Sequence, residues 1–193
     1  PQAAYVCRNA IHNFPDFRFH IVLVNLFEDK PDQILLAFHE RQYIICADNG
    51  LLNMILETKP EILIGIPLSS SSTRDSLNIV RSIGKAILAI TDGQSLDSIG
   101  KPEPAMIEKN PLKPLPHDDW IEGQIIFIDQ FENVVVNITR DEFEAQRKGR
   151  SFRIMFKRDE VIDKISETYA DVSEGEKLAL FNSAGYLEIA INK

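Results

Sequence analysis

The sequence predicts an α/β protein with two parts: an N-terminal α/β sheet domain, truncated at its start, and a small C-terminal β-barrel-like domain. Three observations support this class. Within residues 1–100, short apolar segments alternate with helical patterns. Residues 101–117 contain half of the ten prolines, which is typical of an extended linker. Residues 118–193 are dominated by short β-branched and apolar segments, which predict strands.

The elements of the first part follow from local patterns. An amphipathic helix is expected up to about Asn13, and because the chain opens inside this pattern without Met, we expect an N-terminal portion to be missing. The predicted strands cover residues 20–26, 34–39, 42–47 and 62–66. The first strand is nearly all apolar, which favours a central position in a covered sheet.

Two further helices are predicted from their capping residues. The turn-forming Asp48-Asn49-Gly50 precedes apolar residues at helical spacing, so Asp48 or Asn49 is expected to cap a helix there. Ser72 and Asp75 have the spacing of a capping box, and the helix that they would start runs past Ile87.

The second part is predicted to be mostly strands with one short helix near residues 141–148. The strands are expected within residues 120–128, 134–138, 151–156, 177–181 and 186–191.

Composition excludes several classes of function. The formal net charge of −8 leaves no basic stripe for a nucleic-acid partner. No apolar run approaches the ~18 residues that span a membrane. Cys7 and Cys46 lie in apolar surroundings and are expected to be buried thiols, which suits the cytoplasm. No metal is expected, because none of the four histidines has metal-ligand spacing with either cysteine.

One stretch between two predicted strands carries candidate chemistry. Asp129, Phe131 and Asn133 leave the apolar run at alternate positions, so in an extended segment they share one face. A carboxylate, an aromatic ring and an amide suit a ligand with an ammonium group, a flat base and a hydrogen-bonding edge. The alternative is a hairpin turn in which the Asp and Asn side chains bind local backbone amides.

Four motifs together indicate a family. They are Ala-Asp-Asn-Gly-Leu-Leu from Ala47, Ile-Asp-Gln-Phe-Glu-Asn from Ile128, Thr-Tyr-Ala-Asp-Val-Ser-Glu-Gly-Glu from Thr168, and Phe-Asn-Ser-Ala-Gly-Tyr-Leu-Glu-Ile-Ala-Ile-Asn from Phe181. With these motifs in this order, the chain resembles the S-adenosylmethionine (SAM) hydrolases, or SAM hydroxide adenosyltransferases. These enzymes are relatives of the fluorinase and chlorinase enzymes. The resemblance implies cleavage of SAM by water to adenosine and methionine, with no further cofactor. It also implies a homotrimer in which the N-domain of one subunit and the C-domain of its neighbour hold the ligand.

The resemblance also assigns residues to the ligand. Asp129 matches the carboxylate that receives the methionine ammonium, and Phe131 matches the aromatic residue of that turn. Asn133 matches the amide that binds adenine, which an Asn side chain can pair with through two hydrogen bonds. Ser183 matches a residue that helps to hold the methionine carboxyl end, and Tyr169 falls near the adenine-stacking aromatic residue.

Three positions depart from the family pattern, and two of them, Asn25 and Ser72, bear on catalysis. Asn25 stands where the hydrolase Asp is expected, Ser72 where a His is expected, and Glu132 where a Gly is usual, whereas Arg74 and Asp75 match. Asn25 cannot accept a proton and Ser72 is a poor base, and a general base contributes roughly 10²–10⁴-fold.

The catalytic residues therefore stay unassigned, with Glu28 and Asp29 as candidate substitutes. Two functions remain open: a SAM hydrolase, and a catalytically impaired adenosyl-ligand binder or sensor on the same trimeric fold. A third possibility, a structural protein that has lost the pocket, is disfavoured by the retained ligand-binding set of Asp129, Phe131, Asn133 and Ser183.

Overall fold

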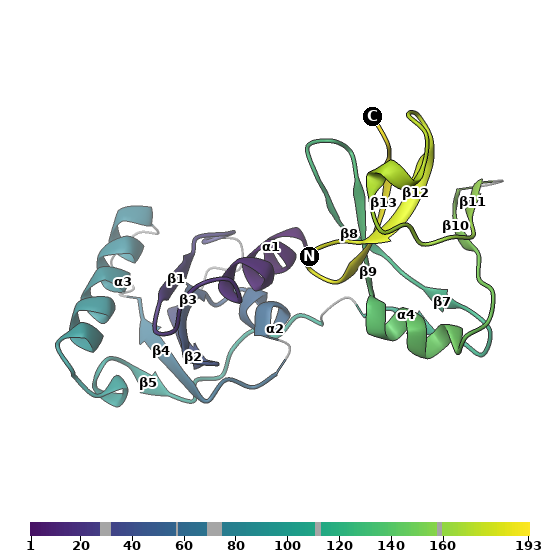
Figure 1. Ribbon diagram of the computed structural model, residues 1–193. Coiled ribbons are helices and arrows are strands. Elements are labelled where there is room, and N and C mark those ends of the chain that lie inside the picture. The colour runs from purple at the N-terminus through teal and green to yellow at the C-terminus, as the bar shows by residue number, and fades with distance from the viewer. Residues whose placement is uncertain (28–31, 57, 69–74, 111–112, 158–159) are drawn as a thin grey trace. The chain divides into compact units, whose positions relative to one another are not determined.

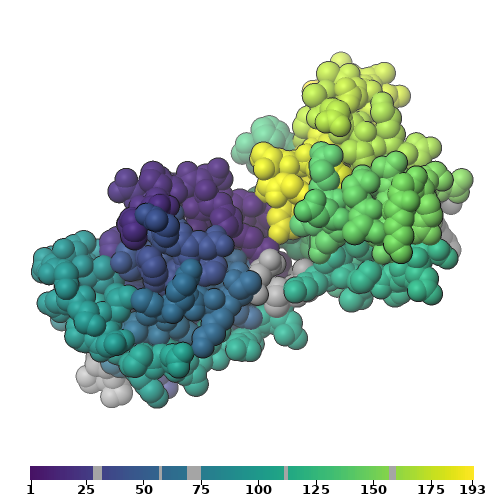
Figure 2. Space-filling view, turned by 60° about the horizontal axis from the view of Figure 1, so that its bottom comes forward, coloured from purple at the N-terminus to yellow at the C-terminus, as the bar shows by residue number. Residues whose placement is uncertain are grey.

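The computed structural model divides into two compact units (Figure 1). It describes all residues except 28–31, 57, 69–74, 111–112 and 158–159. The N-terminal unit covers Ala3–Pro111 and the C-terminal unit covers Leu112–Lys193, with Pro1–Gln2 grouped with the latter. Within each unit, segments far apart in sequence pack together, as the purple against blue and the green against yellow surfaces in Figure 2 show.

A five-stranded mixed sheet forms the centre of the N-terminal unit, in the order β1-β3-β2-β4-β5. Strands β1 and β3 are parallel, and the other neighbours are antiparallel. The strands are β1 (Phe19–Val22), β2 (Gln33–His39), β3 (Gln42–Ala47), β4 (Ile62–Pro67) and β5 (Lys101–Pro102). The predicted α/β fold is thus confirmed, and the strands expected at 34–39, 42–47 and 62–66 are present.

Helices cover both faces of this sheet (Figure 1). Alternate residues of β2 supply the two cores: Leu35 packs with α1 (Gln2–Ile11) and α2 (Leu51–Leu56), and Leu36 packs with α3 (Ser76–Thr91). Because β2 and β3 are buried on both faces, their sequences are continuous apolar runs rather than alternating ones. Neither thiol is in a disulfide, and burial raises the pKa of Cys46 to about 12.

Two predictions for this unit are wrong. The strand expected at 20–26 ends at Val22 and lies at an edge of the sheet, with Ile21 47% exposed. Its apolar run ends where Asn25 adopts a φ of 49°, outside the extended region. The helix α3 begins with Asp75 as its N-cap, whose Oδ1 accepts from Leu77 N at 3.0 Å, so Asp75 cannot be the last residue of a capping box.

The proline-rich segment is extended and hydrogen-bonded to the N-terminal unit as far as Lys109. Strand β5 pairs with β4, and Ala105 O accepts from Gln33 Nε2 at 2.8 Å. Farther along, Ile107 N donates to the buried Asp48 at 2.8 Å. Among the described helices, none combines the length and apolar composition that crossing a membrane requires.

The C-terminal unit is built on a four-stranded antiparallel sheet in the order β12-β13-β9-β8. Its strands are β8 (Ile125–Ile128), β9 (Val134–Thr139), β12 (Lys177–Phe181) and β13 (Tyr186–Ile191). Two pairs of short strands accompany it, namely β6 (Leu115–Pro116) with β7 (Ile121–Glu122) and β10 (Ile154–Lys157) with β11 (Glu160–Ile162). The strand expected over 120–128 is therefore divided between β7 and β8.

One side of this sheet is closed by α4 (Arg140–Arg147), whose Phe143 packs in the core with Val136, Ala179 and Leu187. The helix starts with a capping box, in which the Thr139 side chain accepts from Glu142 N and Glu142 accepts from Thr139 N. The short 3₁₀ helix η2 (Tyr169–Asp171) precedes β12 and brings an aromatic side chain beside β13.

Candidate functional site

The turn between β8 and β9 is shaped by the Asp129 carboxylate. Its Oδ1 accepts from the backbone N–H of Phe131 at 2.8 Å and of Asn133 at 2.9 Å, and its Oδ2 accepts from Asn133 Nδ2 at 2.9 Å. Backbone bonds from Asp129 N to Asn133 O and from Glu132 N to Asp129 O close the turn, each at 3.1 Å. The local role that the sequence allows for Asp129 and Asn133 is thus present in the structure.

A chain of hydrogen bonds leads from this turn to β13. Asn133 Nδ2 also donates to the Tyr169 hydroxyl at 3.2 Å, and that hydroxyl donates to Glu188 Oε1 at 2.5 Å. We call Asp129, Asn133, Tyr169 and Glu188 the polar chain. It joins three segments that are far apart in the sequence, namely the β8–β9 turn, η2 and β13.

Glu188 is the member of the polar chain that sequence reasoning missed. It is the only charged residue of β13, where Leu187 and Ala190 are buried on either side of it. A single carboxylate inside an apolar strand was the signal that could have identified it, because half-buried charges in strands require partners. Its second oxygen, Oε2, accepts from Asn182 Nδ2 at 3.2 Å.

The surroundings of Tyr169 disfavour ionisation of its hydroxyl. Desolvation is the largest cause, followed by the hydrogen bond to Glu188 and the negative charges of Glu188 and Asp129. Together they raise the pKa of Tyr169 above its ordinary value. A tyrosine is protonated at neutral pH even at its ordinary pKa, and the raised pKa extends to higher pH the range in which the hydroxyl donates to Glu188.

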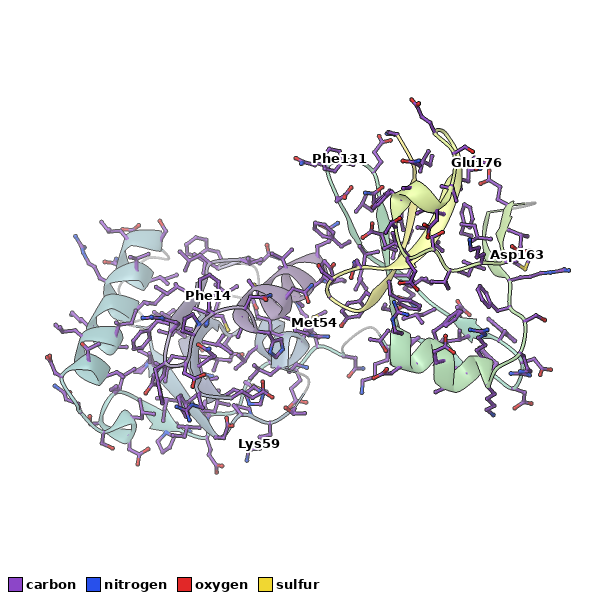
Figure 3. All side chains as sticks on the ribbon, in the orientation of Figure 1. Phe14, Met54, Lys59, Phe131, Asp163 and Glu176 are labelled. Carbon is purple, nitrogen blue, oxygen red and sulfur yellow. The ribbon has the colours of Figure 1, made fainter. Side chains whose placement is uncertain are left out.

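The other two candidate ligand residues lie at turns. Phe131 is at the tip of the β8–β9 hairpin, and its side chain is 63% exposed (Figure 3). Ser183 is exposed in the turn between β12 and β13. Its neighbour Asn182 holds that turn by accepting from Ala184 N at 3.1 Å and Tyr186 N at 3.2 Å, while its Nδ2 binds Glu188. Of the predicted residues, the polar chain therefore joins three directly and reaches the turn of a fourth.

In the N-terminal unit, Asp48 and Asn49 bind the protein itself. The buried Asp48 carboxylate accepts from Gln33 Nε2 at 2.7 Å as well as from the proline-rich segment. Asn49 Nδ2 donates to Val24 O at 2.8 Å, and Asn49 Oδ1 accepts from Leu51 N at 3.1 Å. Asn49 thus fixes the loop after β1 against the start of α2, and Asp48 fixes the proline-rich segment against the start of β2.

The residues at which the sequence departs from its family are only partly described. Asn25 is exposed, and its backbone carbonyl accepts from Asn49 Nδ2 at 3.3 Å. Four further residues discussed for catalysis lie outside the described residues: Ser72, Arg74, Glu28 and Asp29.

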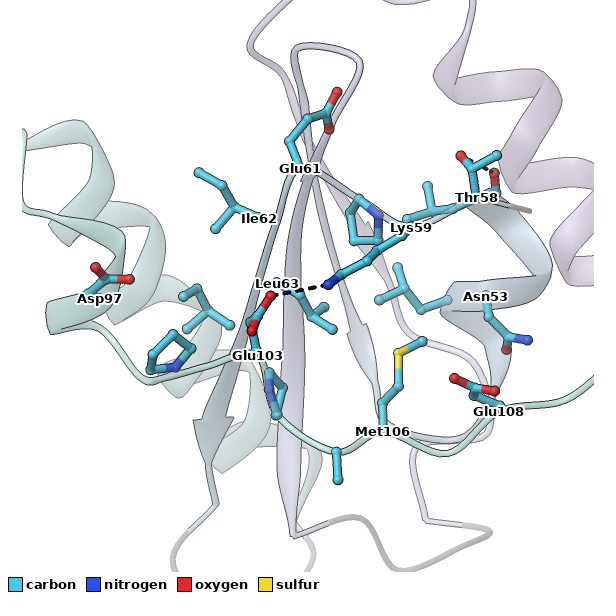
Figure 4. A pocket seen from close by; sticks show the side chains of 17 residues that line it. Asn53, Thr58, Lys59, Glu61, Ile62, Leu63, Asp97, Glu103, Met106 and Glu108 are labelled. Carbon is cyan, nitrogen blue, oxygen red and sulfur yellow. Dashed lines mark hydrogen bonds and ion pairs between the residues drawn. The ribbon is translucent and has the colours of Figure 1, made fainter.

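A cavity of about 840 Å³ lies in the N-terminal unit (Figure 4). Leu52, Leu63 and Met106 supply apolar wall, and several carboxylates line it together with Lys59, which binds Glu103 at 3.1 Å. Its described lining includes none of the residues assigned to the ligand from sequence. The cavity therefore adds no support to that assignment.

Comparison with known proteins establishes the family. Residues 1–100 match the SAM hydroxide adenosyltransferase N-terminal domain, and residues 123–193 match the C-terminal domain of the same family. Together these matches cover most of the chain. The chain belongs to the SAM hydroxide adenosyltransferase family, a family of SAM-processing enzymes that bind an adenosyl ligand.

Solved structures show the same fold. An uncharacterized conserved protein from Thermotoga maritima matches with a TM-score of 0.77 and 24% identity, over 99% of this chain and 76% of its own. A conserved hypothetical protein from Thermus thermophilus matches with a TM-score of 0.71 and 20% identity, over 98% of this chain and 72% of its own.

Proposed function

We propose that this protein binds SAM and transfers its adenosyl group to water, which yields adenosine and L-methionine. The bond between the ribose C5′ and the sulfonium sulfur breaks, a C5′–O bond forms, and the water loses one proton. The observation that supports this proposal is the polar chain. The polar chain holds a carboxylate, an amide and an aromatic hydroxyl together. Both domains of the protein match a SAM-processing family.

Asp129 is the proposed contact for the methionine ammonium. A carboxylate accepts about four hydrogen bonds, and in the described residues Asp129 accepts three. One acceptor position on Oδ2 is therefore left for the ligand. A hydrogen bond to a charged group contributes about 1.5–3 kcal/mol. The turn already fixes the carboxylate, so the ligand does not bear the entropic cost of ordering it.

Asn133, Tyr169 and Phe131 form the proposed adenine contacts, and Ser183 is the proposed contact for the methionine carboxyl end. Tyr169 and Phe131 keep 37% and 63% of their surface exposed, so both have ring surface that a base could cover. Stacking of a base on an aromatic ring contributes roughly 1–3 kcal/mol. These three residues would bind the ligand without taking part in bond breaking.

The reaction requires little of the protein beyond positioning SAM and the attacking water. The sulfonium is already a good leaving group, so the rate depends on holding a water in line with the C5′–S bond. Asn25 favours a second candidate function, an adenosyl-ligand binder that hydrolyses SAM slowly or not at all. The side-chain amide of Asn25 cannot accept the proton of the water, whereas the Asp expected at this position could.

The two candidates are separated by following SAM, adenosine and methionine by chromatography, with SAM affinity measured by calorimetry. The hydrolase predicts turnover by the wild-type protein and at least a tenfold loss of affinity in Asp129→Asn, which keeps the size of the side chain but removes its charge. Asp163→Asn is the matched control, because Asp163 is an exposed carboxylate of the same unit (Figure 3).

Three outcomes would change these proposals. Binding without turnover, with turnover gained in Asn25→Asp, supports the binder and contradicts the hydrolase. Absence of SAM binding in the wild-type protein contradicts both. An affinity that is equal in Asp129→Asn and Asp163→Asn removes Asp129 from the site.

A further inference from the structure

The direction of every hydrogen bond in the polar chain is determined by its two ends, because both ends are carboxylates, which only accept. Asp129 Oδ2 lies 2.9 Å from the Asn133 amide, so the nitrogen of that amide must face it. The Tyr169 hydroxyl has a single proton, which it donates in a hydrogen bond to Glu188 Oε1 at 2.5 Å. Toward Asn133 the same hydroxyl can therefore only accept, and it does so from Nδ2 at 3.2 Å.

Both hydrogens of the Asn133 amide are consequently occupied, one by Asp129 and one by Tyr169. Its carbonyl oxygen Oδ1 accepts no hydrogen bond from the described residues. In the described part of the chain, no side-chain nitrogen or oxygen is both buried and without a hydrogen-bond partner. Because Asn133 Oδ1 has no partner there, it is accessible to solvent. At this position the protein therefore offers a ligand an acceptor and no donor.

We propose that Glu188 and Tyr169 are positioning residues that make Asn133 a pure acceptor, so that the site selects purines with a 6-amino group over purines with a 6-oxo group. This inference rests on the proposed function, because it takes Asn133 to be the contact for the base. The amino group of adenine donates to Oδ1, whereas the 6-oxo group of hypoxanthine would set one acceptor against another. An acceptor left unpaired on binding lowers affinity on the order of 10- to 100-fold.

This arrangement offers the base one hydrogen bond rather than the two-bond pairing that the residue type suggests. Pairing with adenine through both Oδ1 and Nδ2 would require the Asn133–Tyr169 hydrogen bond to break. In the present arrangement a single hydrogen bond to Oδ1 distinguishes the two bases. The residue that enforces this is Glu188, since it fixes the direction in which the tyrosine proton points.

Glu188→Gln tests this role with little change in size. Two donors, the Tyr169 hydroxyl and Asn182 Nδ2, point at the two oxygens of Glu188. Glutamine has one oxygen and one NH₂ group, so one of these donors must meet another donor. When the NH₂ group faces Tyr169, the hydroxyl proton turns toward Asn133 and opposes the Nδ2 donor there. Tyr169→Phe removes the hydroxyl and keeps the ring.

The experiment is calorimetric titration of the full chain with adenosine and with inosine, its 6-oxo counterpart. The wild-type protein should bind adenosine 10- to 100-fold more tightly than inosine. Glu188→Gln and Tyr169→Phe should each lower this ratio at least threefold. Glu174→Gln, a change of the same kind at an exposed residue of the same unit, should leave the ratio unchanged.

The ratio of adenosine affinity to inosine affinity distinguishes a positioning role from a purely structural one. A variant that only loosens the fold weakens both nucleosides equally, so an unchanged ratio in Glu188→Gln and Tyr169→Phe would overturn the inference. Equal binding of both nucleosides by the wild-type protein would overturn it without any variant. A stronger preference for adenosine in Tyr169→Phe would show two-bond pairing, and thus also contradict it. Absence of adenosine binding in the wild-type protein would instead overturn the proposed function.

Discussion

Asp129 shows that a turn-forming residue can also be a candidate ligand contact. Three of its acceptor positions hold the β8–β9 turn, and this same bonding fixes the carboxylate in one orientation. The fourth position is what the proposed function uses. The two interpretations that the sequence leaves open are therefore compatible, because a carboxylate has more acceptor positions than the turn occupies.

Glu132 is explained by its backbone. Its φ of 67° lies in the left-handed region, which glycine adopts without steric cost and other residues rarely enter. The family resemblance implies a glycine at this position, and a glycine suits this φ. The exposed Glu132 side chain has no part in that geometry.

Glu132→Gly should therefore stabilise the protein. Relief of left-handed strain outweighs the greater backbone entropy of glycine in the unfolded chain, for a net gain of about 0.5–1 kcal/mol. Urea denaturation measures the free energy of unfolding. Glu132→Ala removes the side chain but keeps the strain, so it should change stability little. Equal stabilisation by both variants would show that the glutamate side chain, not the backbone, is the cause.

At the scale of elements, apolar periodicity predicted well wherever an element is buried. Strands β2 and β3 and the strands β12 and β13 were located to within a residue, because burial imposes the pattern that identifies them. The pattern failed at β1, where an apolar run continues beyond the last paired residue. The end of that strand depends on its pairing partners and on the left-handed conformation of Asn25. Neither can be predicted from an apolar run.

The turn before α2 lies against the proline-rich segment. Gly50 has a φ of 82°, and a Cβ added there would lie 2.5 Å from Lys109 Cγ. Lys109 is held by Asn53, whose Oδ1 accepts from Lys109 N at 3.2 Å. The Asp48-Asn49-Gly50 motif is therefore a site where two segments approach each other closely, besides being a turn.

Gly50→Ala should destabilise the protein by about 1–3 kcal/mol, through left-handed strain and through displacement of Lys109. Gly93→Ala is the matched control, since Gly93 has a φ of 79° and no atom within 4 Å of an added Cβ. It should lose only the strain, about 1 kcal/mol. Thermal or urea unfolding compares the two. Equal losses would mean that the approach of Lys109 contributes nothing.

For the molecule as a whole, a homotrimer with the ligand between subunits stays a proposal from the family resemblance. The edge of the C-terminal unit is consistent with an interface. Strand β8 pairs only with β9 among the described strands, and its hairpin exposes apolar side chains: Ile125 57%, Ile128 48% and Phe131 63%. Apolar side chains grouped on a sheet edge are unfavourable in water and are typical of protein interfaces.

Sedimentation velocity at several concentrations should therefore give about three times the mass of one chain. Phe131→Ser should shift the population toward single chains, because it removes the most exposed apolar side chain of the hairpin. Val161→Ser is the control, since Val161 is a 50%-exposed apolar residue of the short β11. A single-chain mass for the wild-type protein at every concentration would contradict the trimer.

The sequence by itself determined the α/β class, most of the buried elements and the family, because these depend on local periodicity and on short motifs in order. It also identified Asp129, Asn133 and Tyr169 as candidate ligand residues. Only the tertiary structure revealed Glu188 and the direction of the hydrogen bonds that it sets. The physical reason is that a hydrogen bond joins atoms by their positions in space, and Tyr169 and Glu188 lie 19 residues apart in the chain.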